Sequence, residues 1–285
     1  MRSVLALDLG GTKTTTARVD EEGVVVDRLK VPAERTLEDA VARIAAHVGD
    51  AAAVGVIVPG IYTPSSGCAW CPNLWGAGEV PLLAALQARV SVPVVIDSDR
   101  AGCVVGESWL GAARGLRDVV FVAIGTGIGV GILSDGRVLR GAHGIAGAAG
   151  WFALDPAWTE AYGTMGCWEA EAAGPAIARR AGRSDAGEVV EAARAGDPGA
   201  RAVIARAAGY TAMGVANLVS VINPEVVVLG GGLGYGAADL LLDPVRAGVR
   251  RWAQPIAAAR CRIEASQLGE DAGLLGAARL ALDAC

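Results

Sequence analysis

One short pattern occurs twice in this sequence: an apolar strand, a turn of glycine and threonine, and a second strand. The copies comprise 4–9, Gly10-Gly11-Thr12 and 14–19, then 119–124, Gly125-Thr126-Gly127 and 129–133. Each copy predicts a hairpin, because a glycine turn joins two strand-like runs. A supersecondary unit that recurs indicates two related halves. The sequence therefore predicts two lobes, with a boundary near residue 112.

The segments around these copies predict an α/β protein. In the first half, apolar runs predict strands at 24–29, 53–58 and 92–96 and helices at 37–48, 82–90 and 101–110. From Glu169 onward the pattern is mostly helical, with one strand at 226–229 and a terminal amphipathic helix at 274–282.

The composition excludes several classes of protein. The net charge is −5 and Lys13 and Lys30 are the only lysines, which disfavours nucleic-acid binding. The apolar stretches are broken by glycine before they reach the length of a membrane span, and the first residues run straight into a strand. We therefore expect a cytoplasmic protein that binds no membrane, with free thiols. Cys68 and Cys71 have the spacing of a metal or redox pair, but no second pair accompanies them, which favours two unrelated thiols.

Both glycine turns have the chemistry of a phosphate site. Successive glycines let the backbone approach an anion and direct N–H groups at it, while Thr12 and Thr126 add hydroxyl donors. Neither turn is a P-loop or a dinucleotide motif, since Thr12 precedes Lys13 and the glycines of the second turn alternate by two. The alternative is a pair of ordinary hairpin turns. We expect phosphate binding, because the same chemistry occurs twice.

Three aspartates stand at predicted strand ends. Asp8 can hold Mg²⁺ through water, since Mg²⁺ keeps much of its hydration shell. Asp97 and Asp99 stand where a buried strand meets a helix, whose N-terminus favours an ionised carboxylate by roughly 0.3–1 kcal/mol. Either can accept a proton, and helix capping is the alternative role for Asp99. Spacing alone does not separate the two.

Taken in order along the chain, these motifs resemble the ROK family (repressors, open reading frames, kinases). Residues 8–13 resemble its first phosphate motif, 125–129 its second, and 223–232 its adenosine-binding turn. The loops at Pro59-Gly60 and 72–74 resemble its sugar-side loops, and 269–278 its final helix. The resemblance implies a two-lobed actin-like ATPase (ribonuclease H-like) α/β fold with a cleft between lobes. Residues 1–112, joined by the helix at about 270–285, would form the N-terminal lobe, and 113–269 the C-terminal lobe.

The resemblance also implies a set of ligands and site residues. It implies ATP and Mg²⁺, the latter at Asp8, and a homodimer that takes a small sugar-like substrate. The implied nucleotide contacts are Asp8, Gly10, Gly11, Thr12, Lys13, Gly125, Thr126, Gly127, Asn223, Gly231 and Gly232. The implied substrate contacts are Gly60, Asn73, Ser98, Asp99 and Glu169. Asp99 matches the family's catalytic base, which favours it over Asp97.

The expected sugar pocket departs from the family pattern Ala-Gly-Glu-x-Gly-His. Here the sugar-binding Glu is Ala148, and the His, which also binds zinc in the family, is Trp151. Two zinc cysteines are replaced by Glu160 and Tyr162, and only Cys167 remains. Because one thiolate cannot supply the four ligands of a structural zinc site, we expect no zinc here.

These losses bear on the substrate. A substrate hydroxyl left buried and unpaired costs about 1–3 kcal/mol, and in the family the two lost side chains face the anomeric end. His143 can restore a polar contact, and Trp151 would face the substrate, although exposure is the plainer interpretation of a lone loop histidine. We predict an ATP-dependent kinase that phosphorylates a hydroxyl, expected to be a primary one, on a modified hexose or a C7-cyclitol.

Three alternatives remain open. The first is an ordinary glucokinase. The second is a non-catalytic sugar sensor, although the repressors of the family carry an N-terminal helix-turn-helix and this sequence starts in its first strand. The third is an actin-like ATPase or assembly protein, which the sugar-side motifs at Asn73 and Glu169 disfavour.

Overall fold

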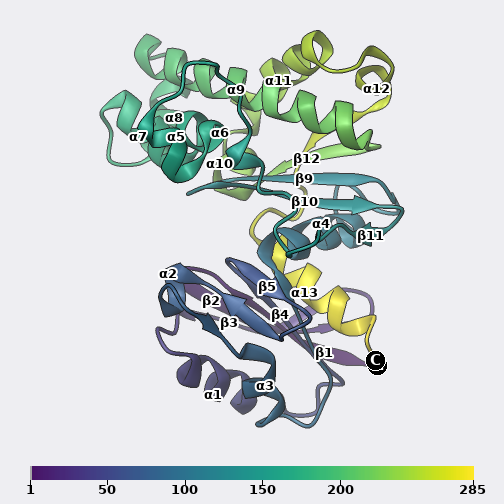
Figure 1. The fold of residues 1–285 in the computed structure, drawn as a ribbon. Helices are drawn as coiled ribbons and strands as arrows, with labels where there is room; N and C mark the ends of the chain where they lie inside the picture. The colour runs from purple at the N-terminus through teal and green to yellow at the C-terminus, as the bar shows by residue number, and fades with distance from the viewer. Residues whose placement is uncertain (1) are drawn as a thin grey trace. The chain divides into compact units, whose positions relative to one another are not determined.

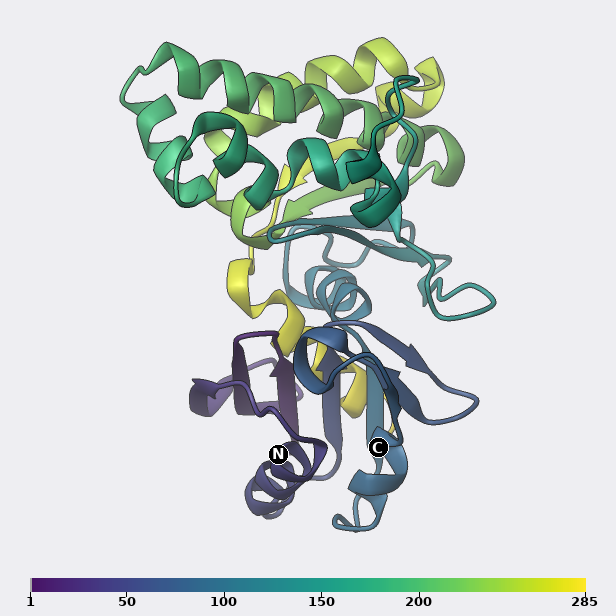
Figure 2. The ribbon, with the colours of Figure 1, turned by 60° about the vertical axis from the view of Figure 1, so that its left-hand side comes forward.

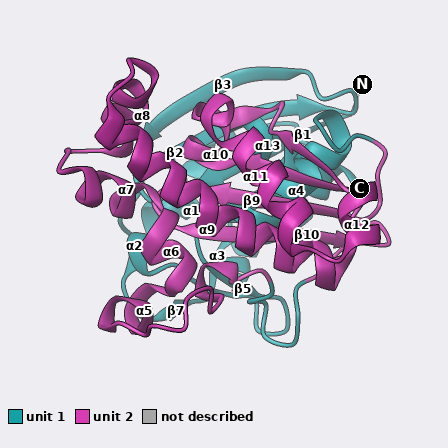
Figure 3. Cartoon of the chain, turned by 90° about the horizontal axis from the view of Figure 1, so that it is seen from above, with its two compact units in different colours: residues 1–114, 140–146, 270–285 teal, residues 115–139, 147–269 magenta. Residues whose placement is uncertain are grey.

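The computed structural model describes residues 2–285, which form two compact units, coloured separately in Figure 3. Unit 1 comprises residues 2–114, Arg140–Ala146 and Glu270–Cys285, and unit 2 comprises Gly115–Leu139 and Gly147–Gly269. The C-terminal segment therefore belongs to the same unit as the N-terminal segment.

Unit 1 is built on a five-stranded sheet with the order β3-β2-β1-β4-β8 (Figure 1). Its strands are β1 (Ser3–Leu9), β2 (Lys13–Asp20), β3 (Val25–Pro32), β4 (Val54–Val58) and β8 (Val94–Ser98). The first three pair antiparallel, and β4 and β8 join in parallel. Asp8 pairs with Ile57, and Ile57 pairs with Asp97. Asp8 and Asp97 therefore lie level with one another, near the carboxyl ends of parallel strands.

The two faces of this sheet bury different side chains. One face packs the alternating leucines of β1 against α1 (Leu37–His47) and α3 (Leu82–Gln87). The other face meets α4 (Asp99–Leu110) and α13 (Ala272–Leu282). Asp8 alternates with those leucines, so its side chain points to the α13 face.

Helix α13 is buried almost all round, so the predicted amphipathic pattern at this helix is wrong. Its small side chains let the backbone approach its neighbours: a Cβ at Gly55 of β4 would lie 2.0 Å from the Ala277 carbonyl oxygen. A Cβ at Gly106 of α4 would lie 2.1 Å from the Ala272 carbonyl oxygen. A helix packed on several sides needs no polar face.

A small three-stranded sheet and a short helix complete unit 1. These elements are β5 (Ile61–Thr63), β6 (Cys68–Trp70), β7 (Glu79–Val80) and α2 (Pro72–Trp75). The sequence pattern did not predict them, since runs of two to four residues show no readable period.

Unit 2 repeats the arrangement of strands, in the order β11-β10-β9-β12-β13. The strands are β9 (Val119–Ile124), β10 (Ile128–Ser134), β11 (Arg137–Val138), β12 (Val226–Gly230) and β13 (Arg262–Ala265). Again an antiparallel hairpin lies beside two parallel strands. The hairpins predicted at both glycine turns are therefore present. The sequence pattern does not predict β13, because its sequence Arg-Ile-Glu-Ala is short and half polar.

The helices of unit 2 lie over one face of its sheet (Figure 2). They are η1 (Ala149–Trp151), α5 (Glu160–Met165), α6 (Cys167–Ala172), α7 (Gly174–Ala181), α8 (Ala186–Arg194), α9 (Pro198–Ile222), α10 (Gly231–Gly236), α11 (Ala238–Trp252) and α12 (Pro255–Arg260), while η2 (Gly269–Asp271) leads back to unit 1. Trp168 is fully buried among them. Within residues 2–285, α9 alone has the length and apolarity of a membrane span, but 61% of its apolar window is buried, as in a core helix.

Candidate active site

The first glycine turn is a tight hairpin between β1 and β2. The Gly10 N–H donates to the Lys13 carbonyl oxygen at 2.9 Å, and a Cβ at Gly10 would lie 2.7 Å from that oxygen. Thr12 and Lys13 are exposed at the tip. The turn thus needs glycine at position 10 and leaves its polar groups accessible to a ligand.

Arg35 joins this turn to the predicted sugar-side loop. Its Nη1 donates to the carbonyl oxygen of Gly11 at 3.3 Å and to that of Asn73, on α2, at 3.0 Å. The structure therefore brings Gly11 and Asn73 together, although they stand 62 positions apart in the sequence. The sequence gives no signal for Arg35, since a single loop arginine belongs to no motif.

Asp8 lies partly buried beside the first turn of α13. The pKa of Asp8 is raised from 3.8 to about 7, mainly by burial and also by the charge of Asp99, while Lys30 acts in the opposite direction. A Cβ at Gly273 would lie 3.0 Å from Oδ2 of Asp8, so glycine leaves room at this carboxylate. Because this carboxylate is costly to ionise without a nearby positive charge, a hydrated cation suits it. Asp8, with the space left by Gly273, therefore fits Mg²⁺ held through water.

Asp97 and Asp99 differ in their partners. Arg140 donates to Oδ2 of Asp97 through Nε at 2.9 Å and Nη2 at 2.6 Å, and the Ser98 N–H donates to Oδ1 at 2.8 Å. Both oxygens of Asp97 are therefore engaged. Asp99 accepts one hydrogen bond from a neighbour, the Arg100 N–H at 2.8 Å. The structure thus leaves Asp99 the freer proton acceptor.

The start of α4 also separates capping from catalysis. Strand β8 runs through Ser98, and the Ser98 Oγ caps the helix by accepting the Ala101 N–H at 3.3 Å. Asp99 is the first helical residue, so the capping role considered for it belongs to Ser98. Burial raises the pKa of Asp99, while Arg100 and nearby backbone N–H groups lower it. The helix N-terminus alone would favour the ionised form, but burial outweighs that effect.

The other predicted substrate residues of unit 1 differ in their packing and in their exposure to solvent. Gly60 lies under β6, where a Cβ would come within 2.1 Å of the Trp70 carbonyl oxygen, so its role in the fold is close packing. Asn73 is exposed on α2. His143 is exposed in the segment Arg140–Ala146. Cys68 and Cys71 are free thiols, and burial raises the pKa of Cys71 to about 12.

The side chain of Glu169 lies against the second glycine turn. The Gly125 N–H donates to the Gly127 carbonyl oxygen at 3.0 Å, and the Ile128 N–H donates to Oε2 of Glu169 at 2.7 Å. A Cβ at Gly127 would lie 2.7 Å from the same Oε2. Burial raises the pKa of Glu169. The structure thereby places a predicted substrate residue directly beside predicted phosphate residues.

A cavity of about 670 Å³ opens beside this turn, entirely within unit 2. Gly125 and Gly232 both line it, and a Cβ at Gly125 would lie 3.9 Å from the Gly232 nitrogen. The rest of the lining is Thr126, Gly174, Pro175, Ala178, Ser184, Asp185, Ala186, Gly187, Val190, Glu191, Arg194, Leu233 and Gly236. Such a volume accommodates a ligand of nucleotide size.

The predicted adenosine-binding residues divide between two places. Gly231 and Gly232 begin the short helix α10, where the analysis expected a turn. Gly231 has a φ of +73°, and a Cβ there would lie 2.6 Å from the Ile124 carbonyl oxygen. Asn223 is absent from the cavity lining; it ends α9 in a left-handed conformation with a φ of +54°. The structure therefore gives Asn223 a helix-ending position.

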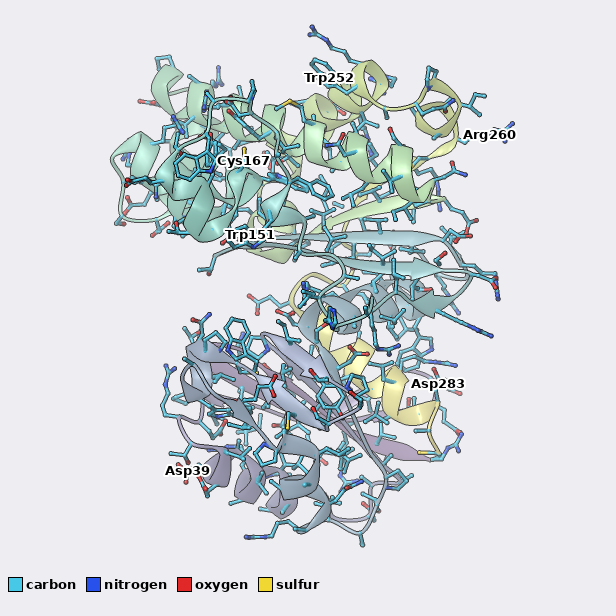
Figure 4. All side chains as sticks on the ribbon, in the orientation of Figure 1. Asp39, Trp151, Cys167, Trp252, Arg260 and Asp283 are labelled. Carbon is cyan, nitrogen blue, oxygen red and sulfur yellow. The ribbon has the colours of Figure 1, made fainter. Side chains whose placement is uncertain are left out.

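The positions that depart from the family pattern all lie in unit 2. Figure 4 labels Trp151 on η1 and Cys167 at the start of α6. Trp151 is 57% exposed and Ala148 is exposed, whereas Cys167 is buried. Within residues 2–285, no group of three or more His, Cys, Asp and Glu side chains is arranged to hold a metal ion. The absence of zinc stays a prediction from the ligand chemistry.

A buried carboxylate network occupies the region of the missing zinc ligands. The Tyr162 hydroxyl donates to Oε1 of Glu171 at 2.9 Å. Arg180 and Arg206 donate to Oε2 at 2.7 Å and 2.8 Å. These contacts tie α5, α6, α7 and α9 together. The sequence gives no signal for this role of Glu171, because its partners come from three other helices.

Comparison with known proteins gives a consistent result. The sequence matches the family model described as ROK family over residues 4–284. It is 34% identical to a glucokinase of Streptomyces coelicolor, over 99% of this chain and 98% of that protein. It is also 34% identical to an N-acetylmannosamine kinase of Citrobacter koseri, over 98% of each.

Solved structures agree with the sequence comparison. A ROK family glucokinase from Streptomyces griseus, in complex with glucose and AMPPNP, matches with a TM-score of 0.83 and 32% identity over 99% of each chain. A ROK hexokinase from Thermus thermophilus matches with a TM-score of 0.83 and 33% identity, over 99% of this chain and 98% of that one. The predicted α/β fold of the actin-like ATPase class is confirmed. This chain belongs to the ROK family.

Proposed function

We propose that this protein is an ATP-dependent kinase that transfers the γ-phosphoryl group to a hydroxyl of a sugar-like polyol. The observation that carries the proposal is the convergence of Gly125 and Gly232 on one nucleotide-sized cavity. The names of the relatives, glucokinase and N-acetylmannosamine kinase, support the same reaction type.

Phosphate binding in this proposal depends on backbone donors. Phosphoryl transfer has a loose transition state, so positioning and charge neutralisation contribute most. The turns at Gly10-Gly11-Thr12-Lys13 and Gly125-Thr126-Gly127 would present N–H and hydroxyl groups to the phosphates. Mg²⁺, when bound through water at Asp8, would supply positive charge against the phosphates. That both turns face one cleft stays a prediction.

Asp99 is the proposed general base. It would accept the proton of the attacking hydroxyl and orient that oxygen. Burial raises the pKa of Asp99, which strengthens it as a proton acceptor, whereas Asp97 is already neutralised by Arg140. Gly60, Asn73, Ser98 and Glu169 would contact the other hydroxyls, and Oε1 of Glu169 is the oxygen that its bond to the Ile128 N–H leaves for this purpose.

The proposed substrate differs from glucose at its anomeric end. Ala148 and the exposed Trp151 offer no carboxylate or imidazole to a hydroxyl there. A modified hexose or a C7-cyclitol would avoid an unpaired hydroxyl. Plain glucose is the second candidate, and it is favoured by the glucokinase relatives.

A screen for polyol-dependent ADP release tests these proposals. Hexoses, hexosamines and cyclitols would each be offered with MgATP, and the ratio kcat/KM compared. We expect ADP release to depend on an added polyol, with a modified hexose or cyclitol ahead of glucose. Fastest turnover of glucose with a micromolar KM would select the second candidate, and no dependence on any polyol would reject the kinase. We also propose that the protein is cytoplasmic and that it forms a homodimer. Light scattering of the purified protein tests the homodimer.

A further inference from the structure

We propose that Arg194 forms the surface on which the purine base of the nucleotide stacks. The inference rests on the proposed binding of ATP in the unit 2 cavity. Arg194 lines that cavity from the last turn of α8, on the same helical face as Val190 and Ala186, which lie one and two turns earlier.

The guanidinium of Arg194 is held in one plane by three partners. Nε and Nη2 donate to the two carboxylate oxygens of Asp239 at 3.0 Å and 2.6 Å. Nη2 also donates to the Gly236 carbonyl oxygen at 2.7 Å, and Nη1 donates to Glu191 at 2.6 Å. Four of its five N–H groups are therefore engaged. One N–H of Nη1 and the flat faces of the group remain for a ligand.

The charges around Arg194 favour a base over a phosphate. Asp239 and Glu191 together carry two negative charges against its one, and their hydrogen bonds raise the pKa of Arg194, which fixes its charge. A phosphate would be repelled by these carboxylates. An uncharged aromatic ring instead gains from stacking on a guanidinium plane.

The rest of the cavity wall suits a flat apolar ligand. Its apolar lining side chains are those of Pro175, Ala178, Val190 and Leu233. Glycines, which have no side chain, also line it. Gly232 and Gly236 face open space, since a Cβ at either would meet no atom within 4 Å. A planar ring can therefore lie against Arg194 without displacing a side chain at these two positions.

Binding of two ligands by calorimetry, without any sugar, tests the inference. MgATP carries a base, and magnesium tripolyphosphate carries the phosphates alone. We expect Arg194→Ala and Arg194→Lys to weaken MgATP binding about threefold or more, because both remove the guanidinium plane on which the base would stack. Binding of tripolyphosphate should stay unchanged. Asp239→Asn, which loosens the plane but keeps the arginine, should give a smaller loss for MgATP alone.

Arg201→Gln is the matched control. Arg201 also donates to a backbone carbonyl, that of Ala193, but it does not line the cavity. Its substitution should leave both ligands bound as in the wild type, and thermal melting would confirm that each variant is folded.

Two results would overturn the inference: unchanged MgATP binding in both Arg194 variants, or an equal loss for MgATP and tripolyphosphate, which would assign Arg194 to phosphate binding or to folding. Wild-type protein that binds MgATP but phosphorylates no polyol would reject the proposed function and leave this inference standing. Wild-type protein that does not bind MgATP would reject both.

Discussion

Asp97 and Asp99 stand two positions apart, and their surroundings give them different roles. Asp97 is buried, and its carboxylate is neutralised by Arg140. Asp99 follows the capping Ser98 and keeps an oxygen for a ligand. A single helix start thus supplies a cap, an ion pair and a candidate base from three consecutive residues.

Substitution of each aspartate should separate these roles. Asp99→Asn should lower kcat by about 100-fold or more, as expected for loss of a general base, with little change in melting temperature. Asp97→Asn should instead lower the free energy of unfolding by about 1–3 kcal/mol, because it weakens a buried charged hydrogen-bond pair. Coupled ADP release and thermal melting measure both effects. Full turnover by the Asp99 variant would remove the catalytic assignment.

Glu169 should make stability depend on pH. Burial raises its pKa above the ordinary value of 4.5, so between the two values the folded protein binds more protons than the unfolded chain. The contribution of Glu169 to the free energy of unfolding should therefore fall as the pH rises from about 4.5 through the raised pKa. Glu169→Gln removes this dependence. Urea unfolding of both proteins at a series of pH values would measure the difference, and parallel pH profiles would contradict the expectation.

Among the helices, α4 and α13 pack closely because glycines face one another. A Cβ at Gly276 would lie 1.8 Å from the Gly102 carbonyl oxygen, and one at Gly106 would lie 2.1 Å from that of Ala272. Gly273, also on α13, has no side chain, and this leaves room for the carboxylate of Asp8. The packing of the two helices therefore helps to shape the proposed Mg²⁺ site.

Alanine at Gly106 should destabilise the protein by about 1–3 kcal/mol, because its Cβ has no room. Gly209 of α9 is the matched control: it is also helical, but it is exposed and its Cβ would meet nothing within 4 Å. Gly209→Ala should stabilise by about 0.4–1 kcal/mol, since alanine restricts the unfolded chain. Denaturant unfolding of the two variants should give opposite signs.

For the whole molecule, ligand binding should appear as added stability. A ligand that binds only the folded protein adds about 2.7 kcal/mol at one hundred times its dissociation constant. MgATP should therefore raise the melting temperature, and EDTA with the same ATP should raise it less, because Mg²⁺ at Asp8 is then lost. Differential scanning calorimetry with ATP, MgATP and Mg²⁺ alone measures each contribution. Equal shifts with and without EDTA would argue against a magnesium role.

The sequence by itself determined the elements whose signal is local. Both glycine-turn hairpins, most strands of the two five-stranded sheets and the helices α1, α3 and α4 follow from apolar periodicity and turn chemistry, which depend on residues close together in the chain. The order of its motifs also identified the family. Short elements such as β5 to β7 and β13 gave no such signal.

The tertiary structure alone decided the partners of the polar residues. Arg140 reaches Asp97, Arg35 bridges Gly11 and Asn73, and Glu171 gathers side chains from three other helices. Tertiary packing also buries α13, and it places Asn223 at the end of α9 and not in the cavity lining. The physical reason is that an ion pair or a packed helix forms between segments distant in the chain, and no local pattern of residue types encodes which distant segments meet.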